Sequence, residues 1–491
     1  MIYRILFLRF HPSVAGSGSQ PPDMLKNPAI VRNLGLYPPL GLAHIASVCK
    51  QNGHEVKILD AYALKLPLDE IEGIFSEFSP HILCVSLWTA TFESELEGVR
   101  ILKSIKDDLI VIVGGPHMDL YARETMERYR FIDYGVIGEG EQTMQELLSA
   151  LSQGRSLEHI NGVIFFKNDK MITTSRRALL SRLDDIPFPL FDGLPLKQYR
   201  TTKSRRMENS IYILTARGCP FKCKYCIDQQ FGRTVRFHSA HYVVSLIKHL
   251  TLNLHIGEIN FYDDTFTLDK QRTLEICEGI INQKLTHIPW TVRTRPDTVD
   301  NEILNALSKA GCRRIIYGVE SGNQRILDQM GREMTLAQIE RAFQLTRKYG
   351  FEIGANFMIG YLGETRETFK QTIAFARALD PDYVMFTITA VRPNSDLYMD
   401  MNAKGIPVKD LWPEYVRGNA ATVNCNFTHI ESEYYGREDL DGMQANAYIK
   451  FYFRPKKIAQ YLKEIRAPKQ FYLYVKIAFE IIKNRLSTLF R

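Results

Sequence analysis

Three cysteines, Cys219, Cys223 and Cys226, lie within eight residues of the 491-residue chain. Thiolates at this spacing on one loop can ligate three irons of a [4Fe–4S] cluster, which leaves the fourth iron without a protein ligand. Zn²⁺ is an alternative, but a zinc site requires a fourth Cys or His nearby, and His238 lies twelve residues beyond Cys226. Three ordinary buried cysteines are the remaining alternative. The spacing favours the iron–sulfur cluster.

Buried strands alternate with amphipathic helices in the first part of the chain. The expected strands are 3–8, 55–59, 82–87, 109–113 and 134–137, and the expected helices are 41–51, 68–78 and 93–106. This alternation predicts βαβ units and a doubly wound parallel sheet over residues 1–155. Ligands of such sheets bind beyond the carboxyl ends of the strands. Those ends carry Ser86–Thr89, Gly114–His117 and Gly138–Glu141.

A second series of strands and helices follows a proline-containing linker at residues 156–200. Its expected strands are 211–214, 258–261, 290–293, 314–318, 353–359 and 383–388, and its expected helices are 241–251, 270–283, 302–310, 336–349 and 365–379. Six such units predict a partial (β/α)₆ barrel over residues 201–396, with the cysteines on the loop after its first strand. Residues 397–491 are expected to be mainly helical.

The composition is that of a folded globular protein, with 45% hydrophobic and 24% charged residues. Arg4 and Arg9 interrupt the short apolar run at the N-terminus, so a signal peptide is not expected. The net charge is +7, and part of the basic excess lies near the C-terminus, which argues against a nucleic-acid groove. A cytoplasmic protein without a nucleic-acid partner is therefore predicted.

The C-x₃-C-x₂-C motif, with Tyr225 before the third cysteine, resembles the radical S-adenosylmethionine superfamily. The resemblance implies that the open iron chelates the amino and carboxylate groups of S-adenosylmethionine. It also implies an external electron donor, such as flavodoxin or ferredoxin, whose electron releases methionine and a 5′-deoxyadenosyl radical.

Further motifs match this superfamily in their order after the cysteines. The resemblance implies that Tyr225 belongs to the S-adenosylmethionine site and that Asp263 and Asp264, in NFYDDTF, hold the methionine ammonium group. It places Glu320 and Ser321, in YGVESG, at the ribose, and Asn356 near the adenine. A helix cap and a turn are the structural alternatives for DD and GVES.

The whole arrangement resembles the subgroup in which a cobalamin-binding domain precedes the radical domain. The resemblance is carried by 37–42 (YPPLGL), 53–60 (GHEVKILD), 114–117 (GGPH), 138–143 (GEGEQT) and 451–455 (FYFRP). It implies cobalamin contacts at Pro39, Gly41, Ser86, Thr89, Gly114, Gly115, His117, Gly138, Glu139 and Gly140. For His117, the alternative to a cobalamin contact is an ordinary structural role. The D-x-H-x-x-G motif is missing, so the resemblance implies either cobalt without a protein histidine or a domain that has lost cobalamin.

If both cofactors are present, the simplest reaction is methyl transfer to an unactivated carbon of a small-molecule substrate. The anaerobic magnesium-protoporphyrin monomethyl ester cyclase class, which forms a ring, shares the same pair of domains. A cluster-bearing electron-transfer protein is the non-enzymatic alternative, although it would not need the S-adenosylmethionine motifs.

The last expected helix carries an apolar stripe beside basic residues. The stripe consists of Phe471, Val475, Phe479, Ile482 and Leu486. Lys476, Lys483, Arg485 and Arg491 are basic and are opposed only by Glu480, a combination that suits contact with an anionic membrane surface or with an apolar, lipid-like substrate. Packing of this helix against the barrel is the alternative.

Overall fold

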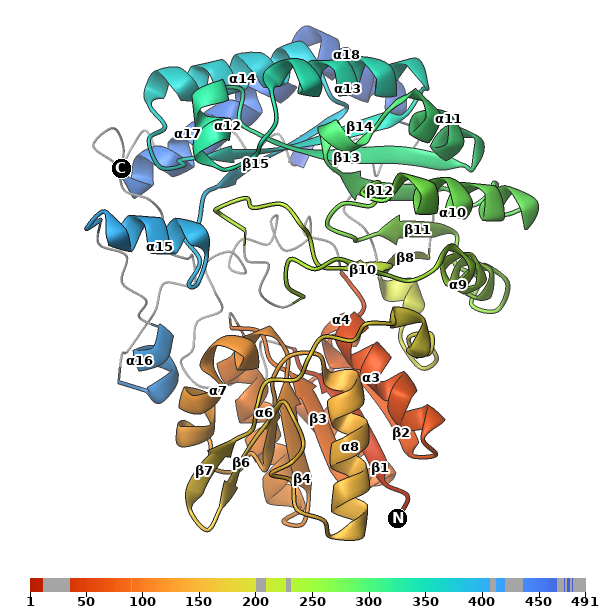
Figure 1. Ribbon diagram of the computed structural model, residues 1–491, viewed down its shortest axis with the longest axis vertical. Helices are drawn as coiled ribbons and strands as arrows, with labels where there is room; N and C mark the ends of the chain where they lie inside the picture. The colour runs from red at the N-terminus through yellow and green to blue at the C-terminus, as the bar shows by residue number, and fades with distance from the viewer. Residues whose placement is uncertain are drawn as a thin grey trace. The chain divides into compact units, whose positions relative to one another are not determined.

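The computed structural model describes residues 1–11, 36–89, 91–199, 209–226, 231–406, 412–419 and 436–465, together with residues 472, 475, 476 and 479. Two compact units make up the structure (Figure 1). The first contains residues 1–219, 228–259 and 410–425, and the second contains residues 220–227, 260–409 and 426–491.

The first unit is built on a seven-stranded sheet with the strand order β2-β1-β3-β4-β5-β6-β7. Its strands are β1 (Arg4–Arg9), β2 (Glu55–Asp60), β3 (Ile82–Ser86), β4 (Ile110–Gly114), β5 (Tyr134–Val136), β6 (Val163–Lys167) and β7 (Lys170–Thr173). Its helices before β6 are α3 (Leu40–Gln51), α4 (Ala61–Leu64), α5 (Leu68–Phe78), α6 (Phe92–Ile105), α7 (Pro116–Arg128) and α8 (Gly140–Gln153). Strands β1 to β5 pair in parallel, which confirms the predicted doubly wound sheet.

Strands β6 and β7 lie within the passage that the sequence analysis assigns to a linker. They extend the sheet as an antiparallel hairpin beyond β5. Asn168 and Asp169 both have positive φ, at 49° and 60°, which is the backbone that a two-residue hairpin turn requires. The prolines that suggested a linker come only after this hairpin.

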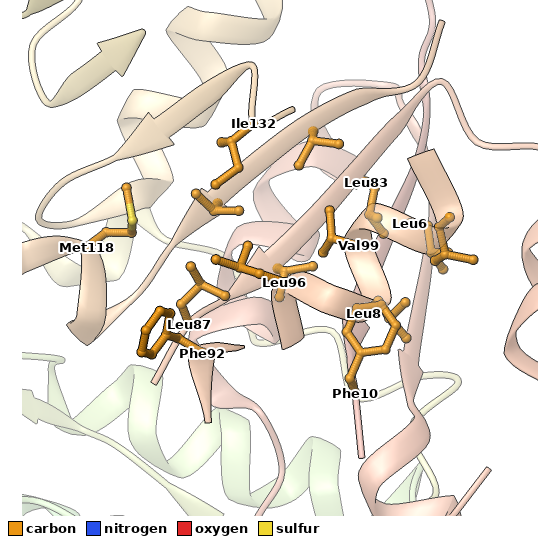
Figure 2. Packing of buried hydrophobic residues seen from close by; sticks show 14 of the residues in the cluster. Leu6, Leu8, Phe10, Leu83, Leu87, Phe92, Leu96, Val99, Met118 and Ile132 are labelled. Carbon is orange, nitrogen blue, oxygen red and sulfur yellow. The ribbon is translucent and has the colours of Figure 1, made fainter. Parts of the chain in front are cut away.

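Apolar side chains from β1, β3, α6 and α7 form the core of the first unit. Figure 2 shows Leu8, Leu83, Leu96 and Met118 among the residues of this core, and each of these four is fully buried. A fully buried side chain of this kind contributes roughly 1.5–3 kcal/mol through the hydrophobic effect. This rigid core holds the carboxyl ends of the strands in place.

The second sheet has six strands in the order β15-β14-β13-β12-β11-β8. The strands are β8 (Ser210–Ile213), β11 (Glu258–Phe261), β12 (Trp290–Thr294), β13 (Cys312–Glu320), β14 (Glu352–Ile359) and β15 (Tyr383–Ile388). The helices between them are α9 (Ala240–Leu252), α10 (Lys270–Asn282), α11 (Asn301–Lys309), α12 (Gln324–Gln329), α13 (Leu336–Lys348) and α14 (Arg366–Leu379). The ladders from β12 to β15 are parallel, and α13 and α14 run along one face of the sheet (Figure 1). The predicted partial barrel is confirmed.

Helix α17 (Arg437–Tyr452) covers the free edge of β15. The Tyr452 hydroxyl accepts a hydrogen bond from the Val384 amide at 2.9 Å and donates one to the Val384 carbonyl at 2.9 Å. Tyr448 makes the same pair of bonds with Phe386, at 3.1 and 3.2 Å. Two tyrosines thus replace the missing neighbouring strand and protect an edge that would otherwise pair with another chain.

The remaining described helices are α15 (Asp396–Ala403), α16 (Trp412–Arg417) and α18 (Pro455–Glu464). No described helix combines the length and the hydrophobicity that crossing a membrane requires. Most of the predicted C-terminal stripe, including Phe471, Ile482 and Leu486, lies outside the described residues. The side chains of Val475 and Phe479, which are described, are exposed.

Candidate functional site

The cysteine motif lies between the two strands of a short antiparallel ribbon, β9 (Ala216–Arg217) and β10 (Arg236–Phe237). Gly218, at φ 90°, separates this ribbon from Cys219. A Cβ atom at Gly218 would lie 2.6 Å from the Thr234 carbonyl oxygen and 2.8 Å from that of Gly232, so only glycine fits there. Cys219 belongs to the first unit, whereas the other two cysteines of the motif belong to the second.

Cys223 has two buried arginines beside its sulfur. The Arg332 guanidinium donates to its Sγ at 3.5 Å, and the Arg295 guanidinium does so at 3.8 Å. Arg295 is itself held by a bidentate ion pair with Asp297, at 2.9 and 2.7 Å. Guanidinium donors on a ligand sulfur stabilise the negative charge of an iron–sulfur cluster and influence its reduction potential. This donor set therefore fits a cluster ligand.

Within the part of the chain that the structure describes, none of the three motif cysteines forms a disulfide bond. Among the described residues, no three His, Cys, Asp or Glu side chains are gathered closely enough to form a metal site. Ligands commonly reach their final geometry only when the metal binds, so the fit of this loop rests on its three thiols and on the two arginines.

Tyr225 and Glu320 lie beside Cys223. Tyr225 lies close enough to Glu320 for the negative charge of that carboxylate to act on the Tyr225 hydroxyl. Burial raises the pKa of Glu320, and the nearby positive charge of Arg332 opposes that rise. The pKa of Tyr225 is raised mainly by burial and, to a smaller extent, by the negative charge of Glu320. The structure thus brings two of the predicted S-adenosylmethionine residues next to a predicted cluster ligand.

The backbone at Glu320 is strained, and the position two residues before it, Gly318, has room only for glycine. Glu320 has φ 72°, in the left-handed region that side chains rarely adopt, at a register shift between β13 and β14. A Cβ at Gly318 would lie 2.7 Å from the Glu320 Oε1 atom. The GVES motif therefore directs a carboxylate back over the end of its own strand, and strain of this kind is typical of functional sites.

The other predicted S-adenosylmethionine residues are spread along the strand ends of the second unit. Asp263 is buried, while Asp264 is exposed, and the pKa of the Asp264 carboxyl is raised by desolvation and by the Asp263 charge. The Ser321 hydroxyl is buried, lies 3.3 Å from the Thr372 hydroxyl and accepts from the Asn323 amide at 3.2 Å. Ser321 therefore has bonding partners within the fold, and its contact with a ribose stays a prediction.

Asn356 is half-buried in β14, where it pairs with Gly318 of β13 and with Met385 of β15. Met385 is exposed, so this face of the sheet is open to solvent beside Asn356. The adenine contact of Asn356 stays a prediction.

His117 lies inside the first unit rather than on its surface. Its Nδ1 atom is 3.3 Å from the Thr89 hydroxyl, and its Nε2 atom is 3.0 Å from the Thr125 hydroxyl. The ring stacks on Phe92, with centroids 4.2 Å apart, and burial lowers its pKa to about 3. Both ring nitrogens are therefore occupied, and the geometry favours the structural role of this neutral histidine over contact with the corrin.

Glycines at two strand ends and one helix start fit the predicted cofactor-binding edge in different ways. A Cβ at Gly115 would lie 2.4 Å from the Ser86 hydroxyl. The predicted residues Gly114, Gly115 and Ser86 are therefore tightly packed where β3 and β4 end side by side. Gly138, at φ 82°, and Gly41 have no atom within 4 Å of a Cβ position, which leaves space for a ligand.

The remaining predicted cobalamin residues differ in their surroundings. Pro39 caps the start of α3, and a Cβ at Gly140 would lie 2.8 Å from the Ile45 side chain. Glu139 is buried in ion pairs with Arg217 and Arg236, at 2.9 and 2.8 Å. Its side chain is therefore engaged within the protein and is not directed to a cofactor.

Glu95 is a buried carboxyl group at this edge that the sequence analysis did not identify. It lies in the first turn of α6, next to the loop that carries Thr89, and its Oε1 accepts from the Thr91 hydroxyl at 2.9 Å. Its Oε2 has no partner in the structure, and burial raises its pKa to about 7. The sequence signal that could have indicated this burial is an acidic residue between the apolar residues Phe92 and Leu96 of one helix.

Replacement of Glu95 by glutamine is expected to stabilise the protein at pH 8 but not at pH 5.5. The folded-state pKa lies above the unfolded value, so the stability contributed by the protonated form is complete below about pH 4.5 and is lost as the pH rises through about 7. At 1.36 kcal/mol per pKa unit, the gain at pH 8 is at most about 3 kcal/mol. Thermal unfolding at both pH values measures it, with Glu97→Gln on the exposed face of α6 as the control. An equal shift of Tm at both pH values would contradict this account.

Two family models match the chain. The model of the radical SAM superfamily matches residues 213–376, and that of the B12 binding domain matches residues 28–148. These matches confirm the predicted superfamily and the predicted cofactor classes, an iron–sulfur cluster with S-adenosylmethionine and a cobalamin.

Known proteins resemble the chain over most of its length. An uncharacterized methyltransferase of Pyrococcus horikoshii is 35% identical over 430 residues, which cover 87% of this chain and 91% of the relative. The anaerobic magnesium-protoporphyrin IX monomethyl ester cyclase of Rubrivivax gelatinosus is 28% identical, with 82% of this chain and 70% of the cyclase covered.

A solved structure shares the fold. The cobalamin-dependent S-adenosylmethionine radical enzyme OxsB, with aqua-cobalamin and S-adenosylmethionine bound, superposes with a TM-score of 0.74 at 16% identity, covering 99% of this chain and 72% of OxsB. The sequence motifs, the two sheets and these relatives agree. The chain belongs to the radical S-adenosylmethionine superfamily of enzymes, in the group whose radical domain follows a cobalamin-binding domain.

Proposed function

We propose that the protein is a cobalamin-dependent radical S-adenosylmethionine methyltransferase that modifies an unactivated carbon of a small molecule. The observation that carries the proposal is the group formed by Cys223, Arg295, Arg332, Tyr225 and Glu320. This group contains the Cys223 thiol, which can ligate a cluster, and the Glu320 carboxylate, which can bind the hydroxyls of a nucleoside. The similarity to a methyltransferase of Pyrococcus horikoshii supports methyl transfer as the outcome.

Cys219, Cys223 and Cys226 would hold the cluster, with Arg295 and Arg332 balancing its negative charge. Glu320 accepts hydrogen bonds from the ribose hydroxyls, and Tyr225 lies near that carboxylate. Asp263 and Asp264, beyond β11, pair with the methionine ammonium group, in charge-assisted hydrogen bonds.

The strand ends of the first unit would hold cobalamin where Gly41 and Gly138 leave space. When bound, the cluster supplies the electron that cleaves S-adenosylmethionine, and cobalamin carries the methyl group. An external reductant, such as flavodoxin or ferredoxin, supplies the electron to the cluster.

Ring formation is the second candidate, because the cyclase of Rubrivivax gelatinosus resembles 82% of this chain. The products distinguish the two. Reconstituted protein is incubated anaerobically with hydroxocobalamin, a strong reductant and methyl-deuterated S-adenosylmethionine. Methyl transfer predicts both S-adenosylhomocysteine and 5′-deoxyadenosine. Formation of 5′-deoxyadenosine alone would favour the cyclase type, and absence of both products would contradict the proposed function.

Cobalt is expected to have no histidine ligand from the protein. The missing D-x-H-x-x-G motif and the two occupied nitrogens of His117 both point to this result. The electron paramagnetic resonance spectrum of bound cob(II)alamin is recorded for protein with natural histidine and for protein with ¹⁵N-labelled histidine. Identical spectra are expected. A change of the nitrogen splitting on labelling would show a protein imidazole on the cobalt.

A further inference from the structure

Two glutamates and two arginines form a buried network in the first unit, which we call the carboxylate clamp: Glu139, Glu141, Arg217 and Arg236. Arg217 donates to the Oε1 atoms of Glu139, at 2.9 Å, and of Glu141, at 2.5 Å. Arg236 donates to both carboxylate oxygens of Glu139 at 2.8 Å. All four side chains are at most 10% exposed. The two positive and two negative charges balance within the protein.

The clamp is attached to the segment that leads into the cysteine motif. Arg217 and Arg236 are directly paired residues of the β9–β10 ribbon, so a single carboxylate, that of Glu139, binds both of its strands. Cys219 comes two residues after Arg217, and its amide donates to the Gly232 carbonyl at 3.4 Å. The intervening Gly218 has no room for a side chain. The position of the Cys219 backbone therefore depends on the position of Arg217.

The carboxylates of the clamp come from the start of α8, which follows β5. Glu139 precedes α8, and Glu141 lies in its first turn, where the positive end of the helix dipole favours negative charge. The Leu180 amide also donates to Glu139 at 2.8 Å, and the Leu180 carbonyl accepts from Arg236 at 2.9 Å. Backbone and side-chain bonds thus lock one ribbon onto the start of one helix.

We propose that Glu139 and Glu141 are positioning residues for Cys219, acting through Arg217 to hold its thiolate in place as a ligand of the cluster. This inference rests on the proposed function, because it requires that a cluster forms at the cysteine motif. Residues that orient a metal ligand from behind commonly contribute 10- to 100-fold to metal affinity. A buried arginine that loses its carboxylate keeps an uncompensated charge, so the ribbon would have to move to hydrate it.

The test compares Glu141→Gln with Glu146→Gln, a control on the same helix. Glu146 pairs with Arg177 at 3.0 Å, is half-exposed and makes no contact with Arg217. Anaerobically reconstituted proteins are challenged with an iron chelator, and the reduced clusters are examined by electron paramagnetic resonance. We expect Glu141→Gln to lose iron about ten times faster than the wild type or more, whereas Glu146→Gln should match the wild type.

The double variant Glu141→Gln/Arg217→Gln separates positioning from overall stability. It restores the charge balance of the buried network, with Glu139 facing Arg236, but removes the side chain that holds β9, the strand leading to Cys219. We expect the Tm of its cluster-free form to return toward the wild-type value while iron loss stays fast. Wild-type iron retention in Glu141→Gln, or iron loss that follows Tm in every variant, would overturn the inference. Failure of the wild type itself to form a cluster would instead contradict the proposed function.

Discussion

Replacement of Cys219, Cys223 and Cys226 by alanine is expected to abolish both the broad visible absorbance of the cluster and all formation of 5′-deoxyadenosine. Without the three thiolates, the loop has no ligand of the kind that iron–sulfur clusters require. The positive charges of the two arginines beside Cys223 would then repel added iron, so iron would not be retained. Iron and sulfide analysis after anaerobic reconstitution measures this loss.

The matched control is Cys277→Ala in α10. Cys277 is also a free thiol, but it is buried in the helix and its pKa is raised by burial to about 12, which disfavours the thiolate that a metal needs. This variant should lose some stability through the missing side-chain packing but keep its iron. A full complement of iron in the triple variant would show that the cluster binds elsewhere.

Substitution of Glu320 by glutamine or alanine is expected to weaken binding of S-adenosylmethionine while the cluster remains. Hydrogen bonds from ribose hydroxyls to a carboxylate contribute roughly 1.5–3 kcal/mol, so the Kd should rise by about 10- to 100-fold. Glu320→Gln keeps the size of the side chain, so it isolates the effect of the charge. Equilibrium binding of S-adenosylmethionine to the reconstituted variants measures the change.

Glu352→Gln is the control for this experiment. Glu352 lies on the neighbouring strand β14, where its carboxylate pairs with Arg314 at 2.7 Å as part of the barrel framework. We expect its loss to lower the Tm but to leave the Kd of S-adenosylmethionine unchanged. Unchanged affinity in Glu320→Gln and Glu320→Ala would remove Glu320 from the cofactor site.

The sequence predicted the barrel strands closely because fully buried parallel strands are continuous apolar runs. Residues 258–261 and 383–388 were predicted with the bounds that β11 and β15 have. The β9–β10 ribbon was not predicted, because each of its strands has two residues and no periodicity can identify them. The passage that contains hairpin β6–β7 was predicted to be rich in strands, but the prolines that follow it led to its assignment as a linker.

The site was predictable where one short segment holds the chemistry. The cysteine spacing and the YGVESG motif are local patterns, and the structure places Cys223 beside Tyr225 and Glu320. The ion pair of Glu139 with Arg217 joins residues 78 positions apart, which no local pattern reveals. For the same reason Glu139 was assigned to the cofactor, although its carboxylate is occupied by two arginines.

We expect one chain to hold both a [4Fe–4S] cluster and a cobalamin. The most direct test is anaerobic reconstitution of the wild-type protein with iron, sulfide and hydroxocobalamin, followed by removal of unbound cofactor, absorption spectroscopy and metal analysis. About four irons and one cobalt are expected per chain, together with the overlapping spectra of both cofactors. A protein that retains zinc instead of iron, or that retains iron and no cobalt, would contradict this expectation.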